Sequence, residues 1–457
     1  MRILLTSDNH LGYKEGDPII GNDSFQTFEE TLSLAFSLNA DFVLQGGDLF
    51  HENTPSKDTL SKTFKILGRY CIGDRPIEFQ TNHVLNFDNE NINISLPIIS
   101  IHGNHDDPCG ISKESIIESI APTYLINYIG KHKNHNNLLI KPLLVHKNDV
   151  KVAIYGVGNV RDNRMYKIFM EGRIKYDRPE DYSSYVNILL LHQNRIPYNG
   201  NDYVPIERIE SWFDLVIFGH EHEPLLYYVD SKDFTVIQCG STVRTSLCEA
   251  EQGSKYAYLL SINDNIDIEK IELKTVRPFV FDNLIINNCI DDCEAILVTK
   301  INEMIDGLNM PLVRLRVEHE GNVINRSRFG QLFKGKIANN WDILKYKRKR
   351  KTKKILHDDE NEQIEPQINT ENKSDFTSGL FINTSLSAIP ESLFVECVKK
   401  CVETGNKTVF EDIVNFTVKN VSEKLQDKVL TTNMLHEEIF HLKNEINRQN
   451  EFKKKHI

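Results

Sequence analysis

The sequence contains no apolar run that approaches the ~20 residues needed to span a bilayer as a helix. We therefore expect no membrane-embedded segment. The first residues, Met1 to Ser7, are too few and too quickly followed by Asp8 to form a secretory signal. They are better explained as the first strand of a globular domain.

Cysteine is also scarce, with eight residues in a chain of 457. Four are scattered and four form two close pairs: Cys71, Cys109, Cys239, Cys248, Cys289/Cys293 and Cys397/Cys401. Neither close pair has the second pair nearby that a structural zinc site needs. The sequence therefore predicts free, buried or half-buried thiols in a reducing compartment, nuclear or cytoplasmic, rather than a disulfide framework.

Positive charge is not in excess either. The chain has 54 Lys and Arg against 65 Asp and Glu, which gives a formal net charge of -11. A field of this sign does not attract nucleic acid. If the protein binds DNA, it must do so through local basic patches, bound metal cations or a partner that supplies charge.

What the chain does contain is five short signatures rich in metal-ligating residue types, each directly after an apolar, strand-like run. They are Asp8-Asn9-His10, Gly46-Gly47-Asp48, Gly103-Asn104-His105-Asp106, His192 and Gly219-His220-Glu221-His222. Open α/β sheets place their sites at the carboxyl ends of strands. Residues from distant parts of the sequence are therefore expected to meet in one cleft.

The order of these runs predicts a large α/β domain followed by a smaller unit. Strand-like runs alternate with helical patterns at 24–38 and 56–70, which indicates an α/β domain over residues 1–275. The polar segment 81–95 predicts a surface loop. A small α+β unit is expected at 276–345, with a helix near 291–305 and a strand at 313–317.

The composition changes abruptly after residue 345. A basic run at 345–354 precedes acidic and polar sequence, so we expect a flexible linker over 346–389. The basic run fits a nuclear import signal, a phosphate-contacting strip or a solvated linker. Residues 390–457 are expected to form amphipathic helices, which either pack back on the body or dock onto another protein. Their first apolar stripe consists of Phe410, Val414, Val418, Val421 and Leu425.

The signatures together contain the ligand types of a two-metal phosphoesterase. Two divalent cations ~3.5–4 Å apart acidify a bound water and clamp a phosphate, and holding them takes a bridging carboxylate with imidazole and carboxamide ligands. Asp48, on its Gly-Gly turn, is the natural bridge. One site would be completed by Asp8, His10 and His222, and the other by Asn104, His192 and His220.

Two further points follow from this ligand set. Glu221 is expected to point away from the metals, because alternate residues of an extended segment share a side. Oxygen and nitrogen ligands without a thiolate favour manganese or iron over a structural zinc.

These motifs resemble those of the calcineurin-like metallophosphoesterase superfamily. The residues in and around them are most similar to one branch of it. Asp8 to Gly12, Gly46 to Asn53, Ile101 to Pro108 and His192 to Arg195 are similar to the meiotic recombination eleven / SbcD family of double-strand-break repair nucleases. Thr275 to Phe279 resembles that family's junction into its DNA-capping domain. The resemblance implies a calcineurin-like β-sandwich flanked by helices, a small α+β capping domain and C-terminal partner-binding helices.

The resemblance also implies an activity. Family members are manganese-dependent DNA nucleases, with exonuclease and single-strand endonuclease activity in double-strand-break repair, so two Mn²⁺ per subunit and a nuclear location are expected. The metal roles carry over to the seven ligands named above. His105 matches the family's catalytic histidine, which can protonate the leaving oxygen, and His51 matches a second active-site histidine.

Partners are implied in the same way, beginning with DNA ends as substrate. Homodimers of the family form through helices that correspond to 56–70 and 112–120 here. The seam would consist of Leu60, Phe64, Ile116, Ile117 and Ile120. The terminal helices resemble the region that grips an SMC-like coiled-coil ATPase of the Rad fifty type. In many eukaryotic members a nibrin-like regulatory subunit docks on an insertion that corresponds to residues 80–95, and this segment is shorter here. The sequence therefore does not decide whether such a subunit binds.

Two other functions fit such motifs. One is another enzyme of the superfamily, a protein phosphatase or small-nucleotide phosphodiesterase, and the other is a non-catalytic scaffold that joins DNA ends and the ATPase. Protein phosphatases of the superfamily carry Gly-Asp-x-x-Asp-Arg-Gly, whereas this chain has Gly47-Asp48-Leu49-Phe50-His51-Glu52-Asn53. A non-catalytic scaffold is disfavoured because no expected ligand is missing. Cys239 stands where the family usually has proline, and we expect only a local effect on that loop.

Overall fold

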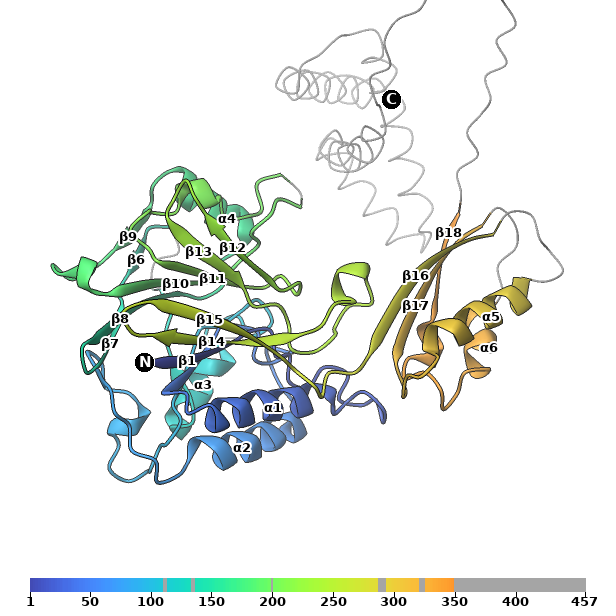
Figure 1. The fold of residues 1–457 in the computed structure, drawn as a ribbon, viewed down its shortest axis with the longest axis horizontal. Coiled ribbons are helices and arrows are strands. Elements are labelled where there is room, and N and C mark those ends of the chain that lie inside the picture. The colour runs from blue at the N-terminus through green and yellow to red at the C-terminus, as the bar shows by residue number, and fades with distance from the viewer. Residues whose placement is uncertain (110–112, 133–135, 199, 287–292, 320–324, 349–457) are drawn as a thin grey trace, which may run out of the picture. The chain divides into compact units, whose positions relative to one another are not determined.

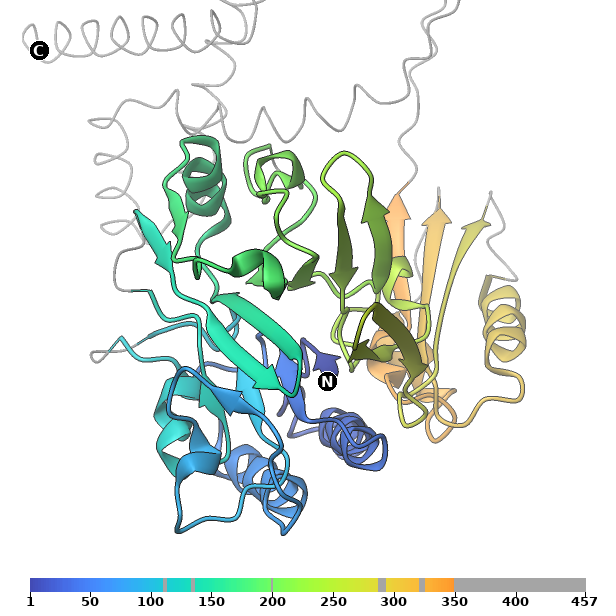
Figure 2. The ribbon, with the colours of Figure 1, turned by 60° about the vertical axis from the view of Figure 1, so that its left-hand side comes forward.

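Two β-sheets packed face to face form the centre of the first 272 residues (Figures 1 and 2). The structure is a computed structural model that describes residues 1–348 apart from 110–112, 133–135, 199, 287–292 and 320–324. The first sheet has the order β15 (Ile266–Glu272), β14 (Tyr256–Ile262), β1 (Arg2–Thr6), β2 (Phe42–Gln45), β4 (Ile98–Ser100) and β5 (Asn127–Tyr128). The second has the order β12 (Leu225–Val229), β13 (Phe234–Gln238), β11 (Leu215–Gly219), β10 (Val186–His192), β8 (Val150–Val157), β7 (Leu143–Lys147) and β3 (Gln80–Thr81). The strands β6 (Leu138–Ile140) and β9 (Ile174–Tyr176) form a separate pair.

The central strands of each sheet run parallel. This holds for β1, β2 and β4 in the first sheet and for β8, β10, β11 and β13 in the second. Parallel strands are buried on both faces, which explains why they occur in the sequence as continuous apolar runs such as Ile188 to Leu191. Their carboxyl ends lie at one edge of each sheet, where the predicted signatures begin.

Helices cover the outer faces of both sheets. On the first sheet these are α1 (Asp23–Ser37), α2 (Lys57–Cys71) and α3 (Ile116–Ile120), whereas α4 (Asp162–Met170) packs on the second. In α1, Phe25, Phe28 and Leu32 are buried against the sheet at the spacing of one helical face. Phe36, which belonged to the predicted apolar pattern, lies off this face and is 52% exposed.

A separate three-stranded sheet follows the sandwich, within the predicted small unit. It consists of the parallel strands β16 (Phe279–Ile286), β17 (Leu312–His319) and β18 (Leu344–Arg348). Parallel neighbours need crossover connections, and these contain α5 (Cys293–Ile305) and α6 (Arg326–Gln331). Leu297 and Phe329 from the helices pack on Leu315 of the sheet. The α/β sandwich followed by a small unit of strands and helices is thereby confirmed. The strands of the small unit are parallel and joined by helices, so its own arrangement is α/β. Strand β18 continues to Arg348, so the small unit extends past its predicted end at residue 345 and the predicted linker cannot begin at 346. The rest of the predicted linker and the C-terminal helices lie outside the described residues.

The thiols largely follow the prediction. All five described cysteines are free. Cys71 and Cys239 are buried, and Cys109 and Cys293 are half-buried. Cys248 is exposed, contrary to the prediction, because it lies in the loop before the short turn at Glu249–Glu251 rather than in a strand or helix.

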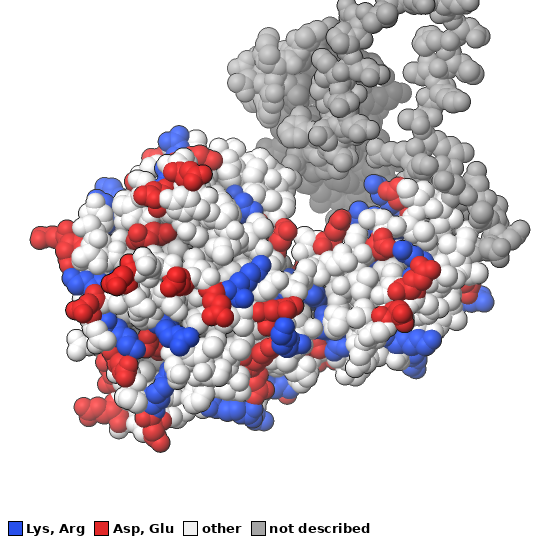
Figure 3. All heavy atoms as spheres, in the orientation of Figure 1, with Lys and Arg blue, Asp and Glu red and all other residues white. Residues whose placement is uncertain are grey.

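The surface agrees with the absence of a basic excess. Figure 3 shows acidic and basic side chains interspersed over the face in view. Within the described part of the chain, no helix combines the length and apolar character needed to cross a bilayer.

Candidate metal centre

The seven predicted ligands come from the carboxyl ends of five parallel strands. β1 and β2 pair so that Thr6 lies opposite Gln45, which places Asp8 and Asp48 just beyond the same edge. The loops after these strands remain paired, since the amide of Asp8 donates to Gly47 O at 3.0 Å and that of His10 to Asp48 O at 3.0 Å. Asn104 follows β4, His192 ends β10, and His220 and His222 follow β11.

One group of ligand atoms gathers around His222. Its Nε2 lies 3.1 Å from His10 Nε2 and 3.7 Å from Asp8 Oδ1. Asp8 and His10 are fully buried, whereas His222 is half-buried. The ligand atoms of these three residues all lie within 4.8 Å of one another, which suits a single cation.

The second group gathers around the carboxamide of Asn104. Its Oδ1 lies 3.1 Å from His192 Nε2 and 2.7 Å from His220 Nδ1. Asn104 is exposed, so the centre is open to solvent on this side. His192 is completely buried, and its other ring nitrogen, Nδ1, lies 2.8 Å from Gly46 O.

Asp48 lies between the two groups. Its Oδ2 is 3.4 Å from His192 Nε2 and 3.9 Å from His10 Nε2. Asp48, His192 and His220 form a further cluster of ligand atoms within 4.8 Å of one another. The structure therefore brings all seven predicted residues together, with a carboxylate placed where a bridge between two cations would be.

The ionisable groups of the centre strongly shift one another's pKa values. Burial raises the pKa of Asp8. Burial also opposes ionisation of Asp48, but the neighbouring His192 holds the Asp48 pKa well below its usual range. For His192, the effect of burial is outweighed by the Asp48 carboxylate, and the pKa rises to about 10. Burial and the charge on His192 lower the pKa of His220 to about 3. Because a ligating imidazole must be deprotonated, cation binding here would be linked to proton release.

Four of the predicted ligands have a backbone conformation that residues other than glycine rarely adopt. The φ angles are +50° at Asp8, +46° at His10, +52° at Asp48 and +84° at His220. Non-glycine residues in this left-handed region carry strain that the surrounding fold must offset, and such residues cluster at functional sites. The turns after β1, β2 and β11 thus accept backbone strain that a simple connection would avoid, and they orient these side chains toward the centre.

Gly103 is packed directly against the predicted bridge. A Cβ atom at this position would overlap Asp48 Oδ1 and approach the Asp48 amide to 2.5 Å. We expect Gly103→Ala to displace the Asp48 carboxylate and to lower phosphodiester cleavage about 100-fold, because catalytic geometry tolerates shifts of less than about 1 Å. Phosphodiesterase rates and Mn²⁺ titrations of the variant would test this. Gly16→Ala, where nothing lies within 4 Å of the added atom and the backbone has no positive φ, is the control.

Asp106 supports the same loops, and the sequence patterns did not assign it a role. It is completely buried, and its carboxylate accepts hydrogen bonds from the amides of Leu49 at 2.8 Å, Asp48 at 3.3 Å and Gly103. Burial and the nearby Asp48 raise its pKa to about 7. Its place in the Gly103-Asn104-His105-Asp106 motif was the one signal that could have identified it.

Glu221 points away from the centre, as predicted. Its Oε1 accepts from the amides of Arg195 at 2.7 Å and Ile196 at 3.1 Å. It therefore ties the loop after His192 to the strand end that carries His220 and His222.

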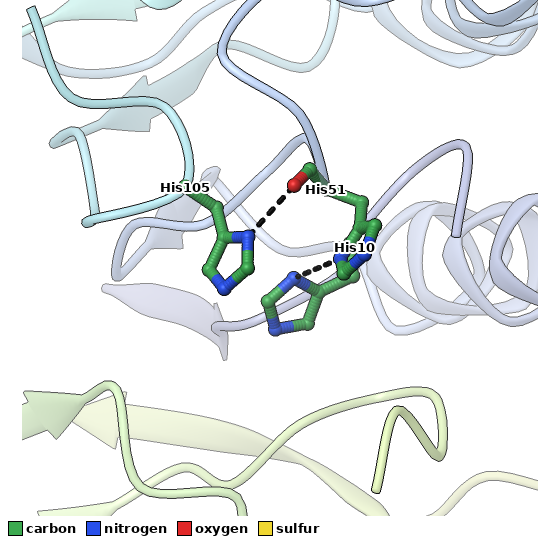
Figure 4. A group of neighbouring side chains, drawn as sticks. All are labelled: His10, His51 and His105. Carbon is green, nitrogen blue, oxygen red and sulfur yellow. Dashed lines mark hydrogen bonds between the residues drawn. The ribbon is translucent and has the colours of Figure 1, made fainter. Parts of the chain in front are cut away.

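The two predicted catalytic histidines lie beside the first ligand group (Figure 4). The rings of His51 and His105 are stacked with centroids 4.9 Å apart. His105 Nδ1 donates to His51 O at 2.7 Å, and the His105 amide donates to Asp48 Oδ1 at 2.7 Å. His51 Nδ1 lies 3.4 Å from His10 Nδ1, and burial together with His105 lowers the His51 pKa. The arrangement fixes His105 Nε2 as the nitrogen that can exchange a proton with a bound group.

The residues predicted for a dimer seam divide into two kinds. Leu60 and Phe64 are half-buried and line an open groove on α2 together with Lys57, Ser61 and Lys65. Ile116 is also half-buried. Ile117 and Ile120 are 0% and 4% exposed inside the chain's own core, so the prediction that they contact a partner was wrong. The predicted partner-binding stripe from Phe410 to Leu425 lies outside the described residues.

Comparison with known proteins agrees with this geometry. A family model described as "Calcineurin-like phosphoesterase" matches residues 1–224, and one described as "Mre11 DNA-binding presumed domain" matches residues 299–401. The second match begins within α5 and runs across the predicted linker, beyond the predicted capping domain at 276–345.

Full-length relatives are similar over most of the chain. "Double-strand break repair protein MRE11" of Encephalitozoon cuniculi is 38% identical over 92% of this chain and 80% of its own length. The protein of the same name from Mus musculus is 32% identical over 93% of this chain and 67% of its own. The Oryza sativa protein is 37% identical, and the chain spans 58% of its length. The chain therefore belongs to the Mre11 family of double-strand-break repair proteins, with a metallophosphoesterase domain at its amino-terminal end.

Proposed function

We propose that this protein is a manganese-dependent DNA nuclease that cuts as both exonuclease and single-strand endonuclease during double-strand-break repair. The observation that carries the proposal is the position of Asp48 between two groups of oxygen and nitrogen donors. A phosphodiester is the substrate class that such a pair of cation sites suits. Membership of a repair family makes DNA the expected phosphodiester.

The donor set fits two Mn²⁺ per subunit. Asp8, His10, His222 and Asp48 would hold one, and Asp48, Asn104, His192 and His220 the other. Carboxylate, carboxamide and imidazole without thiolate favour manganese over a structural zinc. When bound, such ions acidify a water and neutralise charge on the scissile phosphate.

His105 is proposed as the general acid. Its Nδ1–H is held by His51 O, so Nε2 would donate a proton to the leaving oxygen. His51 would position this ring by stacking on it and by its carbonyl oxygen. Neither role requires His105 to hold a cation.

The substrate class can be tested with labelled duplex and hairpin DNA in Mn²⁺, compared with a phosphopeptide. We expect cleavage of DNA, loss of cleavage with a chelator and no release of phosphate from the peptide. Activity on the peptide alone would replace the nuclease with a protein phosphatase.

A homodimer is proposed through the α2 groove, with Leu60 and Phe64 as its apolar centre. We expect Leu60→Asp combined with Phe64→Asp to convert a dimer into a monomer, because two buried charges would oppose association. Light scattering after size-exclusion chromatography measures this directly. Ile72→Asp, which changes an apolar residue 46% exposed just after α2, serves as the control. A wild-type monomer would contradict the proposal.

The remaining partners are proposed from the resemblance and the sequence pattern. The stripe Phe410, Val414, Val418, Val421 and Leu425 would bind an SMC-like coiled-coil ATPase. The basic run at 345–354 would serve nuclear import or DNA contact. Assaying DNA cleavage with and without such an ATPase tests the first of these.

A further inference from the structure

A buried carboxylate lies behind the metal ligand His222. Glu251 is 2% exposed, and its Oε1 lies 3.0 Å from His222 Nδ1. The Ser246 amide donates to the same oxygen at 3.0 Å. Thr245 Oγ1 also lies 3.0 Å from His222 Nδ1, and of the two neighbours Glu251 carries the charge. With Nδ1 donating to Glu251, the lone pair of His222 Nε2 is directed at Asp8 and His10. No sequence motif pointed to this contact.

A buried lysine completes the arrangement. Lys255 is 1% exposed, and its Nζ lies 3.1 Å from Glu251 Oε2. The same ammonium donates to His222 O at 2.9 Å and to Ser241 Oγ at 2.8 Å. Burying two charges is costly unless they are paired and hydrogen-bonded. Here Lys255 Nζ donates to two oxygens and Glu251 Oε1 accepts from the Ser246 amide, whereas Glu251 Oε2 has the ionic contact with Nζ but no hydrogen bond. The pair thus contacts both the ring and the backbone carbonyl of His222.

The other imidazoles of the centre are supported differently. His192 Nδ1 faces the neutral carbonyl of Gly46, and His10 Nδ1 faces His51 Nδ1. In His220, Nδ1 faces Asn104 of the same predicted site and is therefore the nitrogen available to a cation. Among the contacts between described residues, His222 is the imidazole whose remaining nitrogen meets a carboxylate. Such a carboxylate fixes the tautomer of the ring and raises its basicity as a ligand.

We propose that Glu251 and Lys255 are positioning residues for the cation site formed by Asp8, His10 and His222. They hold His222 with Nδ1 protonated and Nε2 free, which raises the affinity of this one site without contact with substrate. The inference rests on the proposed two-cation function and adds to it a difference between the two sites.

The test is a calorimetric titration of Mn²⁺ into the full chain. We expect Glu251→Ala to lower the affinity for one of the two Mn²⁺ ions by about 10–100-fold and to leave the affinity for the other unchanged. DNA cleavage should then require a correspondingly higher Mn²⁺ concentration, with kcat restored at saturation. Glu251→Gln, which keeps an acceptor oxygen but loses the charge, should give a smaller loss. It also provides a variant that folds if the alanine variant does not.

Asp41 offers a matched control. Its carboxylate also pairs with a lysine, Lys147 at 2.6 Å, and accepts from one amide, Arg2 at 2.8 Å. It lies directly before β2, whereas Asp48 follows the other end of that strand. Asp41→Ala is expected to lose stability but to keep both Mn²⁺ affinities.

The possible outcomes separate the two claims. If the wild-type chain binds no divalent cation, the two-cation function fails. If the wild type binds two ions and both Glu251 variants bind them equally well, only the positioning role fails. If Asp41→Ala lowered the Mn²⁺ affinity as much as Glu251→Ala, the positioning role would also fail, since the effect would then reflect a general loss of stability.

Discussion

Asp48→Ala is expected to abolish DNA cleavage, with a loss of at least about 10⁴-fold, or about 5.5 kcal/mol of transition-state stabilisation. The expectation follows from the position of the side chain between both ligand groups. One oxygen, Oδ2, lies within 4 Å of His10 Nε2 and of His192 Nε2. No other carboxylate in the described residues is placed to replace it, because Asp8 contacts the first group and Asp106 is held by backbone amides.

Single-turnover cleavage of a labelled hairpin, together with Mn²⁺ calorimetry, would measure both consequences. The Asp48→Ala variant should bind neither Mn²⁺ ion, or should bind both much more weakly than the wild type. Asp41→Ala, which removes a half-buried carboxylate at the opposite end of β2, should retain both ions. Substantial cleavage by Asp48→Ala with two ions still bound would show that Asp48 is not the bridge.

The sequence predicted correctly, for a local reason, that these seven side chains lie together. Each ligand directly follows a strand that is buried on both faces, so a continuous apolar run marks its position. Parallel neighbours such as β1, β2 and β4 then bring their carboxyl ends to one edge without further information. The two sheets meet at these ends, where the His220 amide donates to Asp8 Oδ2 at 3.1 Å.

The supporting residues could not be predicted because their roles depend on contacts distant in sequence. Asp106 accepts from amides of the loop at Asp48 and Leu49. Glu251 lies in a polar segment, and only the fold buries it beside His222. For the helices, the spacing of apolar residues is a local signal, but it is incomplete. It predicts correctly that one side of a helix is apolar, but it does not tell whether the chain's own core or a partner covers it, as Ile117 shows.

His105→Ala is expected to lower kcat by about 10²–10⁴-fold, the usual contribution of a positioned general acid. Both Mn²⁺ affinities should change little, because the backbone amide of His105 still donates to Asp48 Oδ1 at 2.7 Å. Only the edge contact of its ring with His10, at a centroid distance of 4.9 Å, is removed. Calorimetry therefore separates this variant from Asp48→Ala. Loss of both ions from His105→Ala would instead assign the imidazole a structural role.

The proton-transfer role has a sharper test in the leaving group. A p-nitrophenyl ester of a nucleotide expels a stable anion that needs little protonation, so removal of the acid should matter less. We expect the deficit of His105→Ala to shrink at least about tenfold on this ester relative to DNA, whereas the deficit of Gly103→Ala, which displaces Asp48, should be similar on both. An equal deficit of His105→Ala on the two substrates would mean that its Nε2 does not deliver the proton. His51→Ala should follow the pattern of His105→Ala with a smaller loss, since the carbonyl that holds His105 Nδ1 remains in place and only the stacked ring is removed.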